Sequence, residues 1–311
     1  MTTPTAVLPR QRSYVPSAPL DLGATLAPHA RGPYDPCHRV LGGVHWRTWR
    51  TPIGPATLRL AADPAAGCID ADAWGAGADW ALDAVPALLG DADDAGGFEP
   101  PPGRLRDVHR RLAGMRLSRS GRVFEALVPA VLEQLVTGIE AWRCWSRLLS
   151  AFGEPAPGAA APAGMRVLPA SAALLEIRDW EWHRLGLDGR RRHTLLAAAR
   201  VAARLDEAAA LDVDDAVRRL TSLPGVGIWT AAEVVQRSHG AADVVSVGDY
   251  HLPNTVGFVF TGAPRTSDEQ MLALLEPFRP HRQRVVRLVE ACGLRAPRYG
   301  PRMPIRDNRR M

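Results

Sequence analysis

Residues 220–236 read LTSLPGVGIWTAAEVVQ, a stretch in which Pro-Gly-x-Gly separates two apolar runs. Before the break, DDAVRRLTS has apolar residues at helical spacing, and after it WTAAEVVQR has the same period. The break is too short for a domain linker and too rich in glycine for a continuous helix. The stretch therefore predicts a helix, a tight hairpin and a second helix.

The hairpin has the properties of an anion-binding site. Gly225 and Gly227 allow backbone conformations with positive φ and leave no Cβ in the way of an approaching group. The helix that begins near residue 228 would direct unpaired backbone N–H groups and its positive dipole end toward an oxyanion such as a DNA phosphate. Thr230 would add a hydroxyl. Alternatively, the glycines only turn the chain between two core helices.

The other side of the hairpin offers backbone carbonyls. Those of Thr221, Leu223 and Val226 would encircle a monovalent cation, Na+ or K+, that bridges to the phosphate. Helix-hairpin-helix elements contact the DNA backbone without reading the base sequence. The motif therefore predicts binding to nucleic acid and no particular chemistry.

An aspartate follows the hairpin about twenty residues downstream, in DVVSVGDYHLPNTVGF, residues 243–258. An apolar stretch enters a loop there, and Asp249 stands where the N-cap of the next helix is expected. Aspartate is a favoured N-cap, so a purely structural role would also explain it. Together, the Gly/Pro-rich hairpin and the aspartate at this spacing resemble the signature of the helix-hairpin-helix DNA glycosylase superfamily.

The resemblance extends over about residues 15–295. FEALVPAVLEQLVTG, residues 124–138, resembles the family's early helix, which ends in a glutamine and an apolar wedge. WRTWRTPIGPATLRL, residues 46–60, is similar to the small domain ahead of the helical core in the bacterial DNA-3-methyladenine glycosylases II, the alkyladenine branch. FRPHRQRVVRLV, residues 278–289, resembles their closing helix. The resemblance implies a mainly α fold, with two helical lobes around a cleft and an N-terminal α+β domain like a TATA-binding-protein repeat.

Composition and the resemblance together divide the chain into four parts. We expect a disordered, Pro-rich N-terminus at residues 1–14, the α+β domain at 15–103, the helical core at 104–295 and an Arg-rich tail at 296–311. Three strands are predicted within GGVHWRTWRT, GPATLRLAA and CIDADAW, and a helix within DWALDAVPALLG. The stretch GDADDAGGFEPPPG, residues 90–103, is a linker by composition.

The resemblance also implies roles for individual residues. A glycosylase must flip its target nucleotide out of the duplex and fill the gap. By position in the family motif, Leu135 would be the inserted wedge and Gln134 would lie near the base left unpaired. Leu135 would equally suit the core, because its helix is apolar on more than one face. Breaking the N-glycosidic bond builds positive charge on the sugar, and Asp249 would stabilise it and orient or deprotonate the water.

Some members of the superfamily also cut the strand, using a lysine two residues after the second glycine of the hairpin. Trp229 occupies that position, and the chain contains no lysine, so all 38 of its basic residues are arginine. We therefore expect a monofunctional hydrolase. In the alkyladenine branch an aromatic at this position forms a wall of the base pocket, and Tyr250 also matches. Glu233 and His281 stand where two further pocket aromatics are expected.

These departures bear on the substrate. Trp229 and a pocket-facing Glu233 would favour a cationic base such as 3-methyladenine or 7-methylguanine. Glu233 and Arg237 would equally form a solvated surface pair, four residues apart on one helix. His251 has no clear role in the family and is expected to be structural. The alternatives are a glycosylase for uracil, hypoxanthine or an oxidised purine, and a non-catalytic helix-hairpin-helix DNA-binding protein.

Composition agrees with a DNA-binding protein without a resident cofactor. The net charge of +5 suits an anionic partner, which we expect to be double-stranded DNA bound by a monomer. No apolar run reaches membrane-spanning length and no signal peptide is recognised, so a cytoplasmic, nucleoid-associated protein is expected. The spacing of the cysteines predicts neither zinc nor an iron–sulfur cluster, but reduced and mostly buried thiols at Cys37, Cys68, Cys144 and Cys292.

Overall fold

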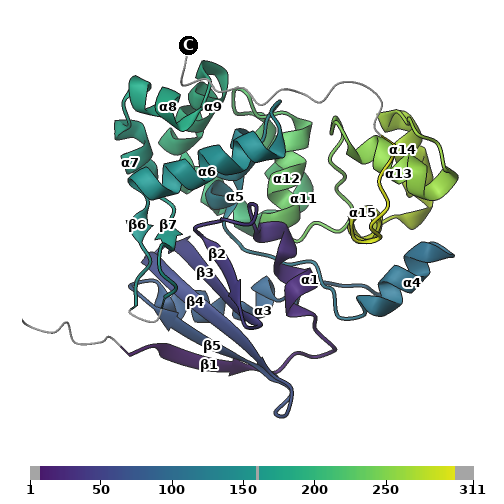
Figure 1. Cartoon of the computed structure of the whole chain (residues 1–311), viewed down its shortest axis with the longest axis horizontal. Coiled ribbons are helices and arrows are strands. Elements are labelled where there is room, and N and C mark those ends of the chain that lie inside the picture. The colour runs from purple at the N-terminus through teal and green to yellow at the C-terminus, as the bar shows by residue number, and fades with distance from the viewer. Residues whose placement is uncertain (1–7, 159–160, 298–311) are drawn as a thin grey trace, which may run out of the picture.

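The computed structural model describes residues 8–158 and 161–297. It contains an antiparallel sheet domain and two groups of helices, which we call lobe 1 and lobe 2 (Figure 1). The expected fold class, mainly helical with an N-terminal α+β domain, is confirmed. The expectations for residues 1–7 and for the tail from residue 298 onward fall outside the described residues. Among the helices of the described ranges, none has both the length and the apolar character needed to cross a bilayer.

The N-terminal sheet has the strand order β1-β5-β4-β3-β2. Its strands are β1 (Arg10–Tyr14), β2 (His38–Leu41), β3 (Val44–Thr51), β4 (Gly54–Asp63) and β5 (Cys68–Trp74). Apolar residues alternate along the central strands, so Trp49, Leu58 and Leu60 share a buried face. That face packs against α2 (Ala78–Asp83) and α3 (Val85–Leu88). The single helix expected here is divided because Pro86 starts a new first turn.

Strand β1 corrects the expectation of a disordered N-terminus at residues 10–14. It pairs antiparallel with β5 along its whole length. Two side chains add cross-strand hydrogen bonds, from Gln11 Nε2 to Asp72 at 2.8 Å and from Ser13 Oγ to Asp70 at 2.8 Å. Only Tyr14 of the strand is buried. The strand therefore lacks the apolar alternation by which strands are recognised in a sequence.

Lobe 1 is built around α5 (Val123–Leu132), whose residues are almost all buried. The helices around it are α6 (Gly138–Phe152), α7 (Ser171–Glu176), α8 (Asp179–Leu185), α9 (Gly189–Arg200), α10 (Ala202–Asp206), η2 (Glu207–Ala210), α11 (Val213–Thr221) and α12 (Ile228–Ser238). The helix–hairpin–helix pattern read from residues 220–236 is thus confirmed as α11 and α12. After α6, β6 (Glu154–Pro155) pairs antiparallel with β7 (Arg166–Val167), and the two short strands bracket a Gly/Pro-rich insertion.

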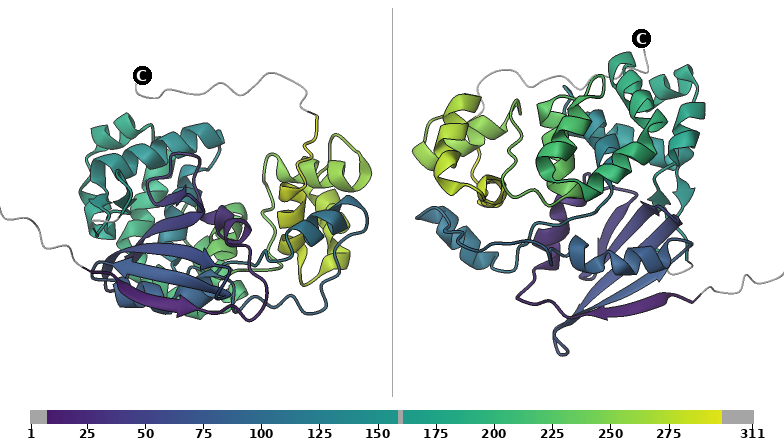
Figure 2. Two further views of the ribbon diagram at one scale, coloured as in Figure 1. Left: turned by 60° about the horizontal axis from the view of Figure 1, so that its bottom comes forward. Right: turned by 180° about the vertical axis from the view of Figure 1, so that it is seen from behind.

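Lobe 2 comprises segments from both sides of lobe 1 in the sequence. Its helices are α4 (Arg104–Arg111), α13 (Leu252–Thr261), α14 (Asp268–Leu275), η3 (Glu276–Phe278) and α15 (Arg282–Ala291). Although α4 precedes lobe 1 in the chain, its residues Leu105 and Val108 belong to the lobe 2 core. In the left view of Figure 2, lobe 2 stands beside the rest of the molecule, with α4 against it. The stretch between α12 and α13 crosses from one lobe to the other and carries Asp249.

One segment of the N-terminal domain contacts both lobes. It consists of α1 (Leu22–Leu26), which stands beside the sheet in Figure 1, and η1 (Ala27–His29). The carbonyl of Ala24 accepts a hydrogen bond from Arg287 of α15 at 3.2 Å. The carbonyl of Pro28 accepts one from Arg237 of α12 at 2.9 Å. The N-terminal domain is therefore tied to the helices that carry the candidate site.

Candidate active site and DNA-binding hairpin

The two glycines of the hairpin have different structural roles. Gly225 has φ +83°, and a Cβ there would overlap the hydroxyl of Thr194. Gly227 is extended, with φ −93° and ψ −179°, and a Cβ there would meet no atom within 4 Å. Gly227 also precedes α12 without a capping side chain, so the first N–H groups of the helix stay available to an anion. The fold needs the first glycine, and the second keeps the approach to the helix end open.

Gln134 joins the hairpin to the expected wedge. Its Nε2 donates to the carbonyl of Gly225 at 3.0 Å and to Thr230 Oγ1 at 2.9 Å. Thr230 is only 2% exposed, so its hydroxyl supports the hairpin from inside and is not presented to a phosphate as expected. Leu135 is 80% exposed with φ +54°. The alternative of a core leucine is therefore wrong, since this side chain projects from the surface in a strained backbone conformation.

The carbonyls expected to hold a monovalent cation lie on the same hairpin. Thr221 ends α11, and Leu223 and Val226 belong to the turn that follows. The Leu223 carbonyl accepts the Val226 N–H at 3.1 Å within that turn. In the described part of the chain, His, Cys, Asp and Glu side chains form no group of three or more suited to a metal ion. The cation at the carbonyls stays a prediction.

Asp249 is held from both sides. Its Oδ1 accepts the backbone N–H groups of His251 at 2.7 Å and Leu252 at 2.8 Å, where α13 begins. Its Oδ2 accepts the indole Nε1–H of Trp229, in the first turn of α12, at 3.1 Å. The expected capping contact is therefore present, although α13 itself starts at Leu252. The carboxylate is fixed in place before any substrate arrives, at the junction between the two lobes.

Tyr250 and His251 follow Asp249 on the surface. Tyr250 is 85% exposed and its ring lies 4.8 Å from that of His251, at a steep angle. His251 contributes its backbone N–H to Asp249, which agrees with the structural role expected for it. Tyr250 directly follows Asp249 in the chain, and its exposed side chain is accessible to a ligand.

Glu233 lies one helical turn beyond Trp229 on α12, and its surroundings overturn the alternative of a solvated surface pair. Its Oε2 pairs with Arg237 at 2.8 Å, and both side chains are largely buried. Its Oε1 accepts the hydroxyl of Ser246 at 2.6 Å, in the stretch that leads to Asp249. Burial alone would raise the pKa of Glu233, but Arg237 and the Ser246 hydroxyl outweigh burial and lower it. Glu233 is therefore an ionised carboxylate whose charge is balanced locally.

His281 lies outside the candidate site, so its assignment to the base pocket needs correction. It is buried, its Nε2 lies 3.2 Å from the carbonyl of Gly96, and its ring lies 5.3 Å from Phe98. Both partners belong to the linker between the sheet domain and α4. His281 precedes α15 and packs this linker against lobe 2. Its position in the family motif predicted a residue of the base pocket. The fold instead directs the ring toward Gly96 and Phe98 of the linker.

Two residues of α15 that the sequence did not single out form an ion pair, Arg287 with Glu290. Arg287 Nη1 lies 3.4 Å from Glu290 Oε2, and the Glu290 side chain is half exposed. Burial lowers the pKa of Arg287, and the charge of Arg237 lowers it further. Arg287 also donates to the Ala24 carbonyl at 3.2 Å, so the closing helix is tied to α1. Their spacing of three residues on a helix expected to close the site is the signal that could have found them.

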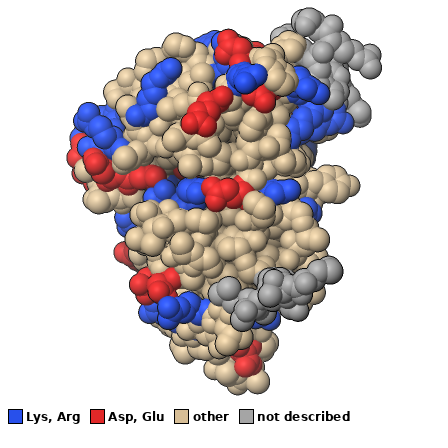
Figure 3. Space-filling view, turned by 90° about the vertical axis from the view of Figure 1, so that its left-hand side faces the viewer, with Lys and Arg blue, Asp and Glu red and all other residues tan. Residues whose placement is uncertain are grey.

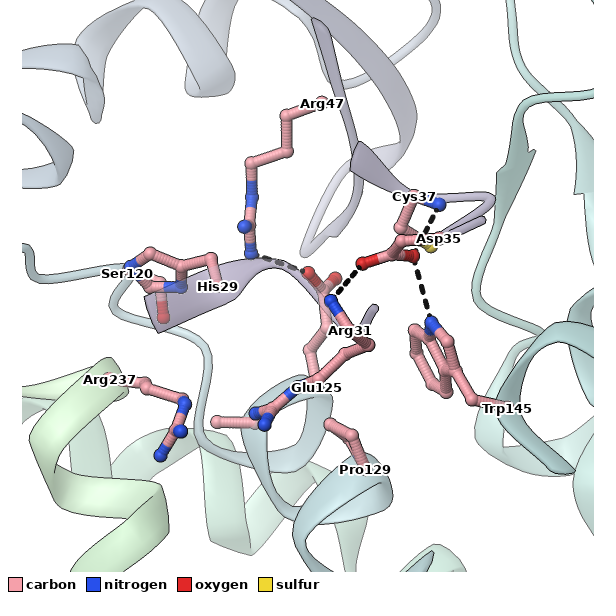
Figure 4. Close-up of a pocket in the computed structure, with 11 residues that line it drawn as sticks. His29, Arg31, Asp35, Cys37, Arg47, Ser120, Glu125, Pro129, Trp145 and Arg237 are labelled. Carbon is pink, nitrogen blue, oxygen red and sulfur yellow. Dashed lines mark hydrogen bonds and ion pairs between the residues drawn. The ribbon is translucent and has the colours of Figure 1, made fainter. Parts of the chain in front are cut away.

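A small cavity of about 30 Å³ lies where the sheet domain meets lobe 1 (Figure 4). Its walls include the side chains of Arg31, Arg47 and Arg237. Each arginine has a carboxylate partner, Glu133, Glu125 and Glu233 respectively. The volume suits about one water molecule and not a nucleobase. The cavity is therefore a gap in a charged domain interface.

Neither the thiols nor the face drawn in Figure 3 adds a second site among the described residues. The four cysteines are free, and burial raises the pKa of Cys144 to about 11, so this thiol stays protonated. On the side of the molecule drawn in Figure 3, basic and acidic side chains are interspersed. That face offers no continuous basic surface to DNA.

Comparison with known proteins gives structural neighbours only. Neither the models of known protein families nor the curated proteins contain a match. The 3-methyladenine DNA glycosylase from Archaeoglobus fulgidus superimposes with a TM-score of 0.72 at 17% identity, over 90% of this chain and 98% of that chain. MBOgg1 in complex with a low-affinity DNA ligand gives 0.70 at 15% identity, over 91% and 95%. The apo 8-oxoguanine glycosylase/lyase from Clostridium acetobutylicum gives 0.67 at 12% identity, over 93% and 99%.

These neighbours share the arrangement described above over nearly their whole length, at identities too low to carry a function across by themselves. The hairpin, the aspartate that follows it and the exposed leucine occur here within that arrangement. The chain therefore has the fold of the helix-hairpin-helix DNA glycosylases.

Proposed function

We propose that the protein is a monofunctional DNA glycosylase of base excision repair. The observation that carries the proposal is the Asp249 carboxylate, fixed by two backbone N–H groups and by the indole of Trp229. A carboxylate oriented in advance beside an anion-binding hairpin is what hydrolysis of an N-glycosidic bond requires. Two structural neighbours are named as glycosylases, one for 3-methyladenine and one for 8-oxoguanine, which supports the same class of reaction.

In this mechanism the hairpin holds a phosphate of the damaged strand through the N–H groups at the start of α12. Leu135 enters the base stack and Gln134 keeps the wedge turn against the hairpin. As the bond from C1′ to the base breaks, positive charge grows on the sugar. Asp249 stabilises that charge and orients the attacking water, whose proton it accepts. The products are a free base and an abasic site.

The absence of lysine supports hydrolysis without strand cleavage. A Schiff-base nucleophile must be an amine, and Trp229 stands at the position where bifunctional enzymes of this superfamily carry it. The indole also has a positive use there, because its N–H donates to Asp249. Trp229 thus supports the Asp249 carboxylate and does not supply a nucleophile.

For the substrate, we propose an N3- or N7-alkylated purine such as 3-methyladenine or 7-methylguanine. Such bases carry a delocalised positive charge, which gains about 0.5–2 kcal/mol over an indole face as water is excluded. Trp229 offers such a face beside the catalytic carboxylate. The resemblance to the alkyladenine branch supports the same choice.

A second candidate is a glycosylase for a neutral base, namely uracil, hypoxanthine or an oxidised purine. The observation that favours it is the pairing of Glu233 with Arg237. Because its charge is balanced locally, Glu233 adds little attraction for a cationic base. The polar groups around Glu233, namely Arg237 and Ser246, suit a neutral base that is recognised by hydrogen bonds to its edge.

Incubation with duplexes that each carry one lesion, followed by alkaline cleavage of abasic sites, tests both candidates. Release of 3-methyladenine or 7-methylguanine faster than of uracil, hypoxanthine or 8-oxoguanine supports the alkylpurine assignment. Faster release of any of those three would replace it by the second candidate. No release from any lesion would leave a non-catalytic DNA-binding protein.

We further propose double-stranded DNA as the partner of a monomer in the nucleoid, with a Na+ or K+ ion at the hairpin carbonyls of Thr221, Leu223 and Val226. The hairpin geometry supports the phosphate contact, and the net charge of +5 supports a polyanionic partner.

A further inference from the structure

The turn that carries Leu135 is held at three points. Glu133 is the C-cap residue directly after α5, and its carboxylate accepts hydrogen bonds from Arg31 Nη1 at 3.0 and 3.2 Å. Gln134 is held by the hairpin. Thr137 caps α6 together with Glu140. Leu135 itself is left exposed with positive φ, so its neighbours must hold the turn in this conformation.

Two of these contacts are local to lobe 1, but Arg31 comes from the N-terminal domain. Arg31 is 7% exposed and follows η1. The loop after it is fixed by Asp35, which accepts the backbone N–H groups of Arg31 at 2.7 Å and Cys37 at 2.8 Å. Asp35 also accepts the indole N–H of Trp145 in α6 at 2.8 Å, as Figure 4 shows. Arg31 is thus an anchored donor and not a flexible surface side chain.

The backbone next to Arg31 is fitted to the same helix. Gly32 has φ +79°, and a Cβ there would lie 2.7 Å from the ring of Trp142, in the second turn of α6. On the other side, the Pro28 carbonyl accepts from Arg237. The segment of residues 28–35 therefore touches α12, α6 and the wedge turn together. The segment therefore connects α12, which begins at the hairpin, to the turn that carries Leu135.

From this geometry we infer that Arg31 is a positioning residue for base extrusion, acting through Glu133 on the turn that presents Leu135. The N-terminal domain then positions the wedge, while Asp249, supported by the indole N–H of Trp229, performs the chemistry. This inference rests on the wedge role of Leu135 in the proposed function. Loss of the Arg31–Glu133 ion pair should slow the extrusion of the nucleotide. Steps that take place after the base has left the stack should keep their rates.

The buried charges determine which variants are informative. Removing one partner would leave the other charge buried without compensation, which destabilises the fold for reasons unrelated to DNA. The double variant Arg31→Leu/Glu133→Leu removes both charges together. The pair Arg47–Glu125 is a matched control, since it is also an ion pair with both side chains 12% exposed and lies in the same domain interface. Its double variant, Arg47→Leu/Glu125→Leu, removes none of the three contacts that hold the wedge turn.

The experiment uses the full chain and a duplex with 2-aminopurine, a base that becomes fluorescent when unstacked, at the target position. For Arg31→Leu/Glu133→Leu we expect extrusion to slow by about ten- to a hundred-fold, the scale of a misplaced group. Binding to a duplex that already contains an abasic analogue should change by less than about three-fold, because that complex needs no extrusion. The Arg47→Leu/Glu125→Leu control should extrude the base at the rate of the unmodified protein.

Equal extrusion rates in the wedge-pair variant and the unmodified protein would overturn the inference, as would equal losses in the two double variants. If the wedge-pair variant does not fold, Arg31→Lys decides, since it keeps the charge and loses the guanidinium. We then expect a partial loss of extrusion with an unchanged melting temperature, and an undiminished rate would contradict the role. The fluorescence does not depend on base release. A protein that extrudes 2-aminopurine but releases no base would refute the proposed function alone.

Discussion

At the residue scale, the contact between Trp229 and Asp249 distinguishes this site from one that uses an amine. Both residues were identified in the sequence by their spacing from the hairpin, and the structure brings them within 3.1 Å. What the sequence could not supply is the direction of the indole, whose N–H faces the carboxylate. A hydrogen bond to a charged group contributes about 1.5–3 kcal/mol. Trp229 is therefore both a candidate wall for the base and a support for the carboxylate proposed to be catalytic.

Substitution of Trp229 by phenylalanine separates these two roles, because the ring stays and the N–H is lost. We expect the single-turnover rate of base release to fall about ten-fold or more, in line with one hydrogen bond to a charged group. DNA affinity should stay within a few-fold. Rapid-quench measurements on methylated duplex check this, and an unchanged rate would show that the indole N–H does not support Asp249.

At the scale of elements, the hairpin contains a matched pair of glycines. Gly225→Ala should lower the melting temperature, because the residue needs positive φ and its Cβ would overlap Thr194. Gly227→Ala should leave stability within about 0.5 kcal/mol, since its backbone is ordinary and the space is open. It should nevertheless weaken binding to all duplexes alike, because the new methyl group stands where the phosphate approaches. Calorimetry and salt-dependent titrations measure both, and a sequence-selective loss in Gly227→Ala would contradict the phosphate role.

The elements also show how far the sequence predicts the fold. Apolar periodicity located the central strands and the hairpin helices, because burial of one face imposes that period. It missed β1, which is polar and held by Gln11 and Ser13 on aspartates of β5. It left Glu233 open between pocket and surface, because its burial depends on Ser246 and on the distant N-terminal segment. His281 was misplaced because the linker that it contacts is far from it in the sequence.

At the scale of the whole molecule, the candidate site lies where three parts of the chain meet. Trp229 belongs to lobe 1, Asp249 stands at the entry to lobe 2, and the segment of α1 and η1 contacts both. The chain also lacks a side-chain amine throughout. We therefore expect borohydride to trap no covalent complex with a lesion duplex, and strands to stay intact until alkali is added. Trapping by protein with a blocked N-terminal amine, seen as a shifted band on a denaturing gel, would refute a monofunctional mechanism.

The stability of the whole chain should depend on its buried histidines, among them His29 and His38 of the N-terminal domain. Burial lowers the pKa of His29 well below 6.5, and burial also lowers that of His38 to about 4. The unfolded chain then binds more protons than the folded one below pH 6.5, so acid favours unfolding. We expect the urea midpoint to be constant above that pH and to fall from there toward about pH 5, before most carboxylates titrate. A midpoint that rises over this window would contradict the buried neutral histidines.

The most direct test of the central claim is single-turnover release of 3-methyladenine or 7-methylguanine from methylated duplex by the unmodified protein and by Asp249→Asn. The carboxylate acts on the transition state and not on the phosphates, so the loss should fall on the chemical step. We expect the variant to release the base at least ~10²-fold more slowly. Its DNA affinity, measured on the same duplex, should stay within a few-fold. A variant that releases the base at a near-normal rate would contradict the assignment of Asp249 and, with it, the proposed mechanism.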